Sequence, residues 1–77
     1  MELYFYEDCE YSQIVLNTIT TLKIKDKFTF KDIRLNPDYA KELLELTGDV
    51  MVPCLITQDG PTKEAKDIRK YLVSHFL

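Results

Sequence analysis

Hydrophobic positions along the chain alternate between two spacings, one typical of strands and the other of helices. The chain opens with a short apolar and aromatic run at residues 3–6, which is typical of a strand buried on both faces. Apolar and polar residues alternate over residues 28–33, which favours a second strand with one wetter face. A third β-prone run spans residues 50–57, but Pro53 interrupts it, because a proline cannot donate to a sheet ladder.

Three segments carry the spacing of an amphipathic helix. Between residues 11 and 22 the apolar side chains fall at positions 11, 14, 15, 19 and 22, which form one helical face. A second helix is expected to begin at Asn36-Pro37, with the asparagine as N-cap and the proline in the first position, and to end before Gly48. Residues 65–76 predict a third helix, whose apolar side chains again share one side.

The order of these elements predicts the fold class. Residues 58–61 predict a turn, and residues 62–64 are expected to add one short strand at most, so the order is β-α-β-α-β-β-α. A helix between consecutive strands implies a parallel pair, and two strands close in sequence imply an antiparallel hairpin. The sequence therefore predicts an α/β fold: a single domain over residues 1–77, with a four-stranded mixed sheet and helices on both faces.

Composition and charge exclude several classes of protein. The 77 residues carry a net charge of −3, whereas a nucleic-acid-binding surface needs clustered lysines and arginines. No apolar run approaches the roughly 18–20 residues of a membrane span, and the first residues lack the basic and apolar segments of a signal peptide. Two cysteines and one histidine are too few for a disulfide framework or a structural zinc site, so no metal is expected. We expect a reducing, cytoplasmic location.

Cys9 is the strongest candidate for chemistry. It lies between a buried strand and the helix that follows at once, where unpaired backbone N–H groups and the positive end of the helix dipole stabilise a thiolate. Ser12 follows one helical turn later, which gives the spacing Cys-x-x-Ser. A cysteine taken alone is more often a small core residue, so the surrounding motifs have to decide between the two interpretations.

Those motifs resemble a glutaredoxin, a small member of the thioredoxin superfamily. The matching pieces are the opening strand, Cys9-x-Tyr11-Ser12, the helix from Asn36-Pro37 and Val52-Pro53 before a strand. The resemblance covers nearly the whole chain and implies a thioredoxin-like fold. It also implies that Cys9 attacks a mixed disulfide between a protein and glutathione. Ser12 stands where a dithiol enzyme has its second cysteine, so a second glutathione would have to release the mixed disulfide.

The same resemblance implies a glutathione site around the thiol. Tyr11 would flank this site, Pro53 would be a cis proline facing the thiol, and the Val52 backbone would pair with the tripeptide like an added strand. The second half of the chain also resembles the N-terminal domain of glutathione transferases, in which a Glu-Ser pair opens the last helix and holds the γ-glutamyl group. Glu64 matches that glutamate, whereas Ala65 lacks the hydroxyl group.

Acidic residues flank Cys9 in the sequence, where the family usually has a lysine before the cysteine and a proline after it. Glu7, Asp8 and Glu10 are the residues concerned. A helix terminus favours a thiolate by about 0.3–1 kcal/mol, and each exposed carboxylate within about 6 Å opposes it by a similar amount. We therefore predict that the pKa of Cys9 is depressed less than is usual in this family.

Cys54 is expected to be a packing residue. Because adjacent strand residues point to opposite faces, it should face the core if Pro53 faces Cys9, and no bridge between the two cysteines is expected. The other candidates are interpreted as packing or solvated side chains, although the basic ones can also bind a glutathione carboxylate. They are Tyr4, Tyr6, Tyr39, Tyr71, His75, Arg34, Lys41 and Lys63.

The leading functional hypothesis is a glutathione-dependent thiol-disulfide oxidoreductase, with Cys9 and Ser12 in its catalytic motif. Its cofactor is glutathione, and its partners are glutathionylated or disulfide-containing proteins, with no nucleic acid and no membrane. We expect a monomer. Two alternatives stay open: a glutathione-binding or protein-interaction module with little catalysis, and an iron–sulfur cluster carrier. The second has less support, since Glu10 and Tyr11 replace the Gly and Phe of the cluster-binding C-G-F-S motif.

Overall fold

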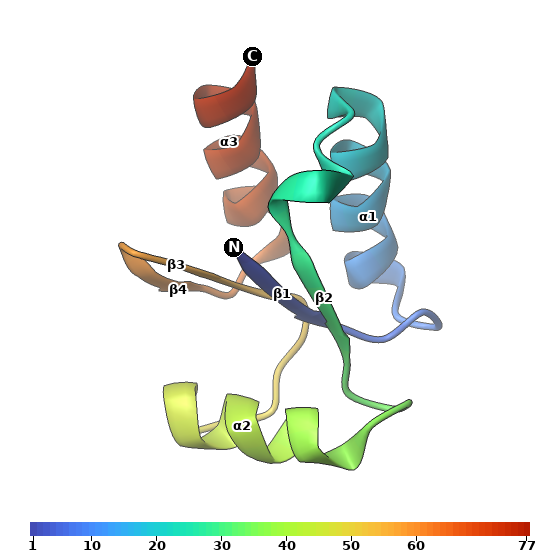
Figure 1. Ribbon diagram of the computed structural model, residues 1–77, viewed down its shortest axis with the longest axis vertical. Coiled ribbons are helices and arrows are strands. Elements are labelled where there is room, and N and C mark those ends of the chain that lie inside the picture. The colour runs from blue at the N-terminus through green and yellow to red at the C-terminus, as the bar shows by residue number, and fades with distance from the viewer.

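The computed structural model describes residues 1–77 and arranges them as a sheet between two helical layers (Figure 1). Helices α1 and α3 cover one face of the sheet and α2 covers the other. The elements in chain order are β1 (Glu2–Phe5), α1 (Glu10–Leu22), the short 3₁₀ helix η1 (Lys25–Lys27), β2 (Thr29–Asp32), α2 (Pro37–Thr47), β3 (Cys54–Thr57), β4 (Gly60–Thr62) and α3 (Ala65–Phe76).

The sheet has the strand order β2-β1-β3-β4, so β1 lies in its interior. Strand β2 runs parallel to β1, while β3 is antiparallel to both β1 and β4. The register pairs Tyr4 with Cys54 and Leu55 with Thr62. The end of β1, the start of β3 and the end of β4 therefore meet at one end of the sheet. This topology confirms the predicted thioredoxin-like fold, with a mixed four-stranded sheet and helices on both faces.

Two apolar layers hold the helices on the sheet. The larger layer lies under α1 and α3, where Leu3 and Leu55 of the sheet meet Val15, Ile19 and Ile68 of the helices. Since side chains alternate along a strand, the neighbouring positions point the other way. A smaller cluster of Tyr4, Leu43 and Cys54 lies under α2.

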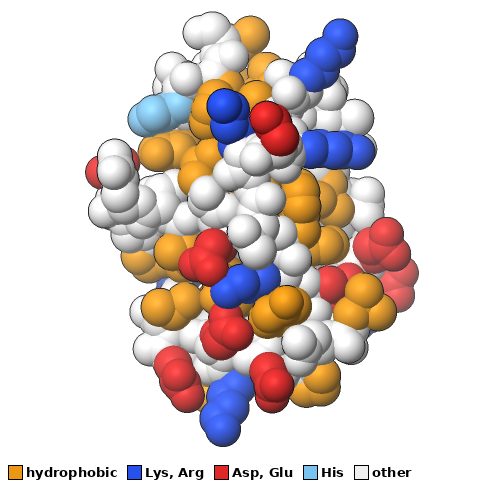
Figure 2. Space-filling model, viewed as in Figure 1, with side chains coloured by type: hydrophobic (Ala, Val, Ile, Leu, Met, Phe, Trp, Pro, Cys, Tyr) orange, Lys and Arg blue, Asp and Glu red, His pale blue; other side chains and the backbone are white.

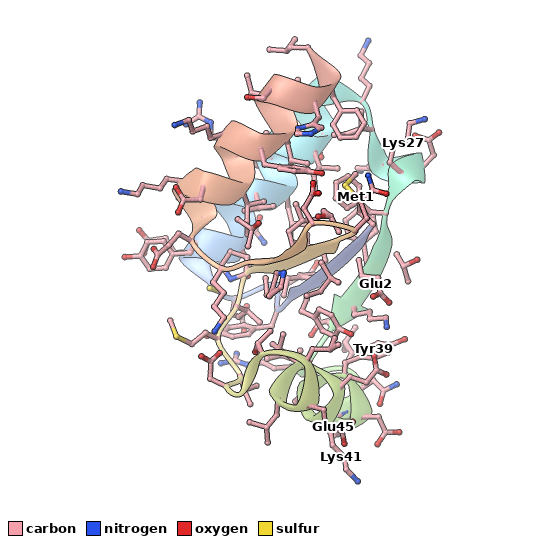
Figure 3. The ribbon with its side chains drawn as sticks, turned by 90° about the vertical axis from the view of Figure 1, so that its left-hand side faces the viewer. Met1, Glu2, Lys27, Tyr39, Lys41 and Glu45 are labelled. Carbon is pink, nitrogen blue, oxygen red and sulfur yellow. The ribbon has the colours of Figure 1, made fainter.

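A partly buried cluster of one lysine and two carboxylates adds to the attachment of α2. The Lys31 side chain, 14% exposed, lies 2.7 Å from a carboxylate oxygen of Glu2 and 2.8 Å from one of Glu42. The same Glu42 oxygen accepts a hydrogen bond from the Tyr4 hydroxyl at 2.9 Å. These contacts join β1, β2 and α2. Figure 3 labels two of the residues around Lys31, namely Glu2 on β1 and Tyr39 on α2.

The predicted helices agree with the structure, including their ends. Asn36 caps α2 by accepting a hydrogen bond from the Asp38 N–H at 3.0 Å, and Pro37 opens the helix. Gly48 ends it with φ 85°, in the left-handed region that glycine tolerates. None of the three α-helices combines the length and the apolarity that crossing a lipid bilayer requires.

The strand boundaries in the second half were predicted less well. Strand β3 begins only at Cys54, after Pro53, and β4 begins at Gly60, inside the segment predicted to be a turn. Gly60 adopts φ 100°, which lets the chain reverse within two residues after Thr57. Pro61 fits into β4 because this strand is at the edge of the sheet, where a residue without an N–H group is tolerated.

The packing predicts that Leu43 holds α2 to the sheet. Its side chain is fully buried, whereas that of Leu44, one residue later, is 48% exposed. Replacing Leu43→Ala should lower the free energy of unfolding by about 2–4 kcal/mol, because it leaves a cavity beside Tyr4 and Cys54. The matched Leu44→Ala variant should lose less than about 1 kcal/mol. Urea unfolding measures both, and equal losses would contradict this account of the α2 layer.

Candidate functional site

Cys9 is the N-cap residue of α1, which agrees with its expected place between the first strand and the helix. Its backbone is extended, with φ −83° and ψ 118°, and its carbonyl accepts the first helical hydrogen bond from the Gln13 N–H at 3.0 Å. The Cys9 N–H donates to the Tyr6 carbonyl at 3.2 Å, and the Gln13 side chain donates to the Glu7 carbonyl at 2.8 Å. These bonds fix the loop between β1 and α1, so the position of the thiol is set by both elements.

Groups at the start of α1 lower the pKa of the Cys9 thiol. Burial of the sulfur raises this pKa, but hydrogen-bonding groups around it lower the pKa by more in total. They are the Ser12 hydroxyl, the backbone N–H groups of Ser12 and Tyr11, and the Tyr6 hydroxyl. No capping hydrogen bond to the Cys9 side chain falls within ordinary limits, which is consistent with a neutral thiol being a weak acceptor. A thiolate would draw these donors closer.

Ser12 is buried beside this thiol with its hydroxyl group unpartnered. The residue is fully buried, and its Oγ makes no hydrogen bond within ordinary distance and angle limits. Its effect on the pKa of Cys9 is therefore that of a nearby polar group rather than of a well-formed bond. A buried hydroxyl without a partner is costly, and ionisation of Cys9 would provide it with an acceptor.

Tyr6 and Arg34 also belong to this site, although the sequence interpretation treated them as a packing residue and a solvated charge. The Arg34 guanidinium stacks 3.8 Å above the centre of the Tyr6 ring, and its Nη1 lies 3.4 Å from a carboxylate oxygen of Asp8. The backbone N–H of Arg34 donates to the Asp32 carboxylate at 2.9 Å, which orders the turn that carries this side chain. The Tyr6 hydroxyl therefore approaches Cys9 from a ring that the Arg34 guanidinium covers on one face.

The three carboxylates that flank Cys9 in the sequence are not among its main neighbours in the structure. The groups that shift the pKa of Cys9 most include none of Glu7, Asp8 and Glu10, and Asp8 pairs with Arg34. The exposure of all three side chains keeps their charges in water, which screens them. That the pKa of Cys9 is depressed less than in glutaredoxins stays a prediction.

The Val52–Pro53 segment lies at the same end of the sheet as Cys9, because the start of β3 pairs with the end of β1. The peptide bond before Pro53 is cis, and Pro53 itself is buried. The backbone N–H and C=O of Val52 take part in none of the loop hydrogen bonds, so they are free to pair with an extended ligand. Asp49 orders the preceding loop: it accepts a hydrogen bond from the Met51 N–H at 3.2 Å and pairs with Lys63 at 3.0 Å.

Glu64 and Tyr11 border a groove between α3 and α1. Glu64 is the exposed N-cap residue of α3, and its carboxylate makes no capping bond and no ion pair with the protein. Tyr11 is 61% exposed on the first turn of α1. Both line the same groove, whose volume is about 520 Å³. Ala65, which follows Glu64, is buried and offers no hydroxyl group.

Cys54 has the environment of a packing residue, as expected. It is fully buried between Tyr4 and Leu43 on the face of the sheet that α2 covers, and α1 covers the other face. Burial raises the pKa of the Cys54 thiol, as does the Asp49 carboxylate, while Lys63 opposes them. Both cysteines are free thiols. Cys54 is thus inert under conditions in which Cys9 can react.

Comparison with known proteins identifies relatives of this fold. Residues 3–76 match the family described as glutathione S-transferase, N-terminal domain. Similar solved structures are an epsilon-class glutathione S-transferase from the housefly, Musca domestica, and glutathione S-transferase isozyme E7 from Drosophila melanogaster. Each has 23% sequence identity and a TM-score of 0.78, and the match covers 97% of this chain but 34% of the solved chain.

These matches differ in what they establish. At 23% identity the two structures show a shared fold alone, and this chain spans about a third of their length. No match was found among the curated proteins. The family match places the chain closer to glutathione transferases than the glutaredoxin resemblance implied, although both families share the thioredoxin-like fold.

The geometry predicts that Tyr6 helps to stabilise the Cys9 thiolate. The Tyr6→Phe variant keeps the ring that Arg34 covers but loses the hydroxyl, so the pKa of Cys9 should rise. Tyr11→Phe is the matched control, because Tyr11 acts on the thiol through its backbone N–H, and its pKa for Cys9 should match that of the unmodified chain. Thiolate absorbance followed against pH measures both. An unchanged pKa in Tyr6→Phe would exclude this role.

Proposed function

Because the chain belongs to the glutathione S-transferase N-terminal domain family, we propose that it binds glutathione and transfers glutathionyl groups through Cys9. Residues 1–77 would act as one domain and as a monomer, with glutathionylated or disulfide-containing proteins as substrates. Domains of this family bind glutathione, which supports the first half of the proposal. The observation that carries the second half is a thiol with a lowered pKa at the N-terminus of α1.

The binding residues are proposed from the geometry at this end of the sheet. The free backbone groups of Val52 would pair with the extended tripeptide, next to the buried cis Pro53. The unpaired Glu64 carboxylate would hold the ammonium group of the γ-glutamyl residue. Tyr11 would cover the ligand from the first turn of α1. A donor, an acceptor and an anion so placed fit a peptide that carries an ammonium group.

The chemistry follows from thiol-disulfide exchange. The Cys9 thiolate attacks the glutathione sulfur of a mixed disulfide, the bond to the protein sulfur breaks, and the released protein thiolate takes a proton from water. The thiolate of a second glutathione then attacks the Cys9 mixed disulfide. This step releases oxidised glutathione and restores the Cys9 thiolate, so two glutathione units leave joined to each other. The α1 donors stabilise Cys9 both as nucleophile and as leaving group.

Ser12 sets the monothiol character of this proposal. Its hydroxyl can donate to the thiolate, but it cannot displace a disulfide. Cys54 is too deeply buried to take over that step, and it faces α2. Resolution would therefore depend on free glutathione. In this respect the proposed reaction is that of a glutaredoxin working with one cysteine.

A glutathione-binding module with little turnover is the second candidate, and Ala65 is the observation that favours it. Ala65 opens α3 and is buried. An alanine has no hydroxyl group, so the one that accompanies the glutamate in related domains is missing here. Weaker binding of the γ-glutamyl group would lower the occupancy of the site by glutathione. Calorimetry with glutathione, run beside the turnover assay, separates binding from catalysis.

Catalysis through Cys9 has a direct test in a glutathione-coupled assay with a small mixed disulfide. Cys9→Ser should reduce turnover to the uncatalysed rate, because a hydroxyl group does not form the mixed disulfide. Cys54→Ala is the matched control and should retain the activity, since this thiol is buried away from Cys9. Full turnover by the Cys9→Ser protein would refute the proposed function.

The role of Glu64 predicts a specific defect. Glu64→Gln should raise the KM for glutathione about 3- to 10-fold, the effect of losing one exposed charge-assisted contact worth about 0.6–1.4 kcal/mol. The rate at saturating glutathione should change little, because Glu64 does not touch the sulfur atoms. Asp67→Asn, which removes a carboxylate from the first turn of the same helix, is the control and should leave KM unchanged. Equal effects of both substitutions would argue against a contact at Glu64.

A further inference from the structure

The side chain of Arg34 lies next to the loop that carries the thiol, although the two are far apart in the sequence. Arg34 belongs to the turn between β2 and α2. The Ile33 N–H donates to the Phe5 carbonyl at 2.9 Å, which holds this turn beside the end of β1. The Asp32 carboxylate orders the turn further, because it accepts hydrogen bonds from the N–H groups of Arg34 and Leu35 at 2.9 and 3.2 Å. The backbone therefore places Arg34 at the end of the sheet where the thiol lies.

The guanidinium of Arg34 lies over one face of the Tyr6 ring. Its central carbon is 3.8 Å from the ring centre, well inside the roughly 6 Å within which a cation is attracted to an aromatic face. The ammonium group of Lys31 makes looser contacts with the rings of Tyr4 and Tyr39, at 5.2 and 5.5 Å. Because a planar guanidinium can stack on an aromatic ring, the close contact of Arg34 restricts the tilt of the Tyr6 ring.

The hydroxyl group of this ring is one of the groups that lower the pKa of the Cys9 thiol. The Arg34 charge is not itself among those groups. A cation over the face of a phenol ring attracts the electrons of the ring, so the O–H bond becomes more polar and the hydroxyl group a stronger donor. An effect of Arg34 on the thiol would therefore pass through Tyr6.

The Asp8 carboxylate orients the Arg34 side chain. The Arg34 Nη1 lies 3.4 Å from a carboxylate oxygen of Asp8, and the two side chains are 59% and 86% exposed. Figure 2 shows acidic side chains at the edge of the molecule over the loop between β1 and α1, which contains Asp8. An exposed pair of this kind is weak, so it draws the guanidinium towards the loop without removing its charge.

We propose that Arg34 is a positioning residue for the reaction at Cys9, which holds the Tyr6 ring in the orientation that directs its hydroxyl group at the sulfur. This inference rests on the proposed function for its effect on turnover, but not for its effect on the thiol. Because Arg34 acts through Tyr6, its contribution should disappear when the Tyr6 hydroxyl group is removed. A solvated charge without this role would show no such dependence.

The experiment measures the pKa of Cys9 from alkylation rates against pH, with and without the Arg34 guanidinium. Arg34→Met keeps a long side chain and removes the cation, so the pKa of Cys9 should rise by about 0.4–0.7, as expected for one exposed cation–π contact. At a pH below this pKa, the alkylation rate should fall about 2.5- to 5-fold, since fewer thiols are ionised. Arg34→Lys keeps a cation that can lie over the ring, and it should recover at least half of the change.

Three comparisons test the route through Tyr6. In the Tyr6→Phe background, Arg34→Met should change the pKa of Cys9 by less than half as much, because the hydroxyl group is already gone. In the Asp8→Asn background it should keep its full effect, which excludes the released Asp8 carboxylate as the cause. Lys25→Met is the matched control and should leave the pKa unchanged. Lys25 is exposed on η1, which precedes β2 at the opposite end of the sheet from Cys9.

These pKa measurements need neither glutathione nor turnover, so they are independent of the test of the proposed function. Where the chain turns over a small mixed disulfide, kcat/KM of Arg34→Met should reach its plateau at a higher pH, with the plateau nearly unchanged. An unchanged pKa of Cys9 in Arg34→Met would overturn the proposal. An equal rise in the Tyr6→Phe background would overturn it as well, because Arg34 would then act on the thiol directly.

Discussion

The first turn of α1 leaves backbone N–H groups that no carbonyl of the helix can accept, and the site depends on where these groups point. Those of Tyr11 and Ser12 lie close enough to the Cys9 sulfur to lower its pKa, and the hydroxyl groups of Ser12 and Tyr6 add to them. Because Cys9 is itself the N-cap residue, the helix and its reactive group cannot be separated. Anything that displaces the start of α1 changes the chemistry of the thiol.

The layers of the fold fix that start. Strand β1 lies in the interior of the sheet and leads directly to Cys9, while α1 and α3 pack together over the larger apolar layer. The antiparallel return of β3 and β4 brings Val52, Pro53 and Glu64 to the same end of the sheet. Helix α2 is held separately on the other face, by Leu43 and the Lys31 ion pair. The reactive thiol and the proposed ligand groups thus come together from three separate parts of the chain.

Local signals in the sequence predicted most of the fold and the position of Cys9 at the start of α1. Asn36, Pro37 and Gly48 act at the ends of α2 as their types predict, and the inward orientation of Cys54 follows from strand alternation. The β4 boundary was wrong because edge position, which makes Pro61 acceptable, is a property of the assembled sheet.

Contacts between distant residues explain the rest of what the sequence did not predict. Arg34 lies 26 positions from Asp8, so neither this pair nor the stacking on Tyr6 has a local signature. The expectation about the acidic residues rested on their closeness to Cys9 in the sequence, and it stays a prediction. In the structure the donors of α1 and Tyr6 surround the thiol, while the carboxylates are exposed to water. Tyr6, three residues before Cys9 at the end of a strand, was the one visible hint.

The most direct test of this account is the pKa of Cys9 measured in the folded chain and again in the chain unfolded by urea. Alkylation rates against pH give both values, with Cys54→Ala as the background so that only one thiol reports. The account predicts a lower pKa in the folded chain, because the donors at the start of α1 exist only there. It also predicts that folding is favoured more strongly as the pH rises above the folded-state value. A folded-state pKa equal to or above the unfolded one would contradict the claim that α1 activates Cys9.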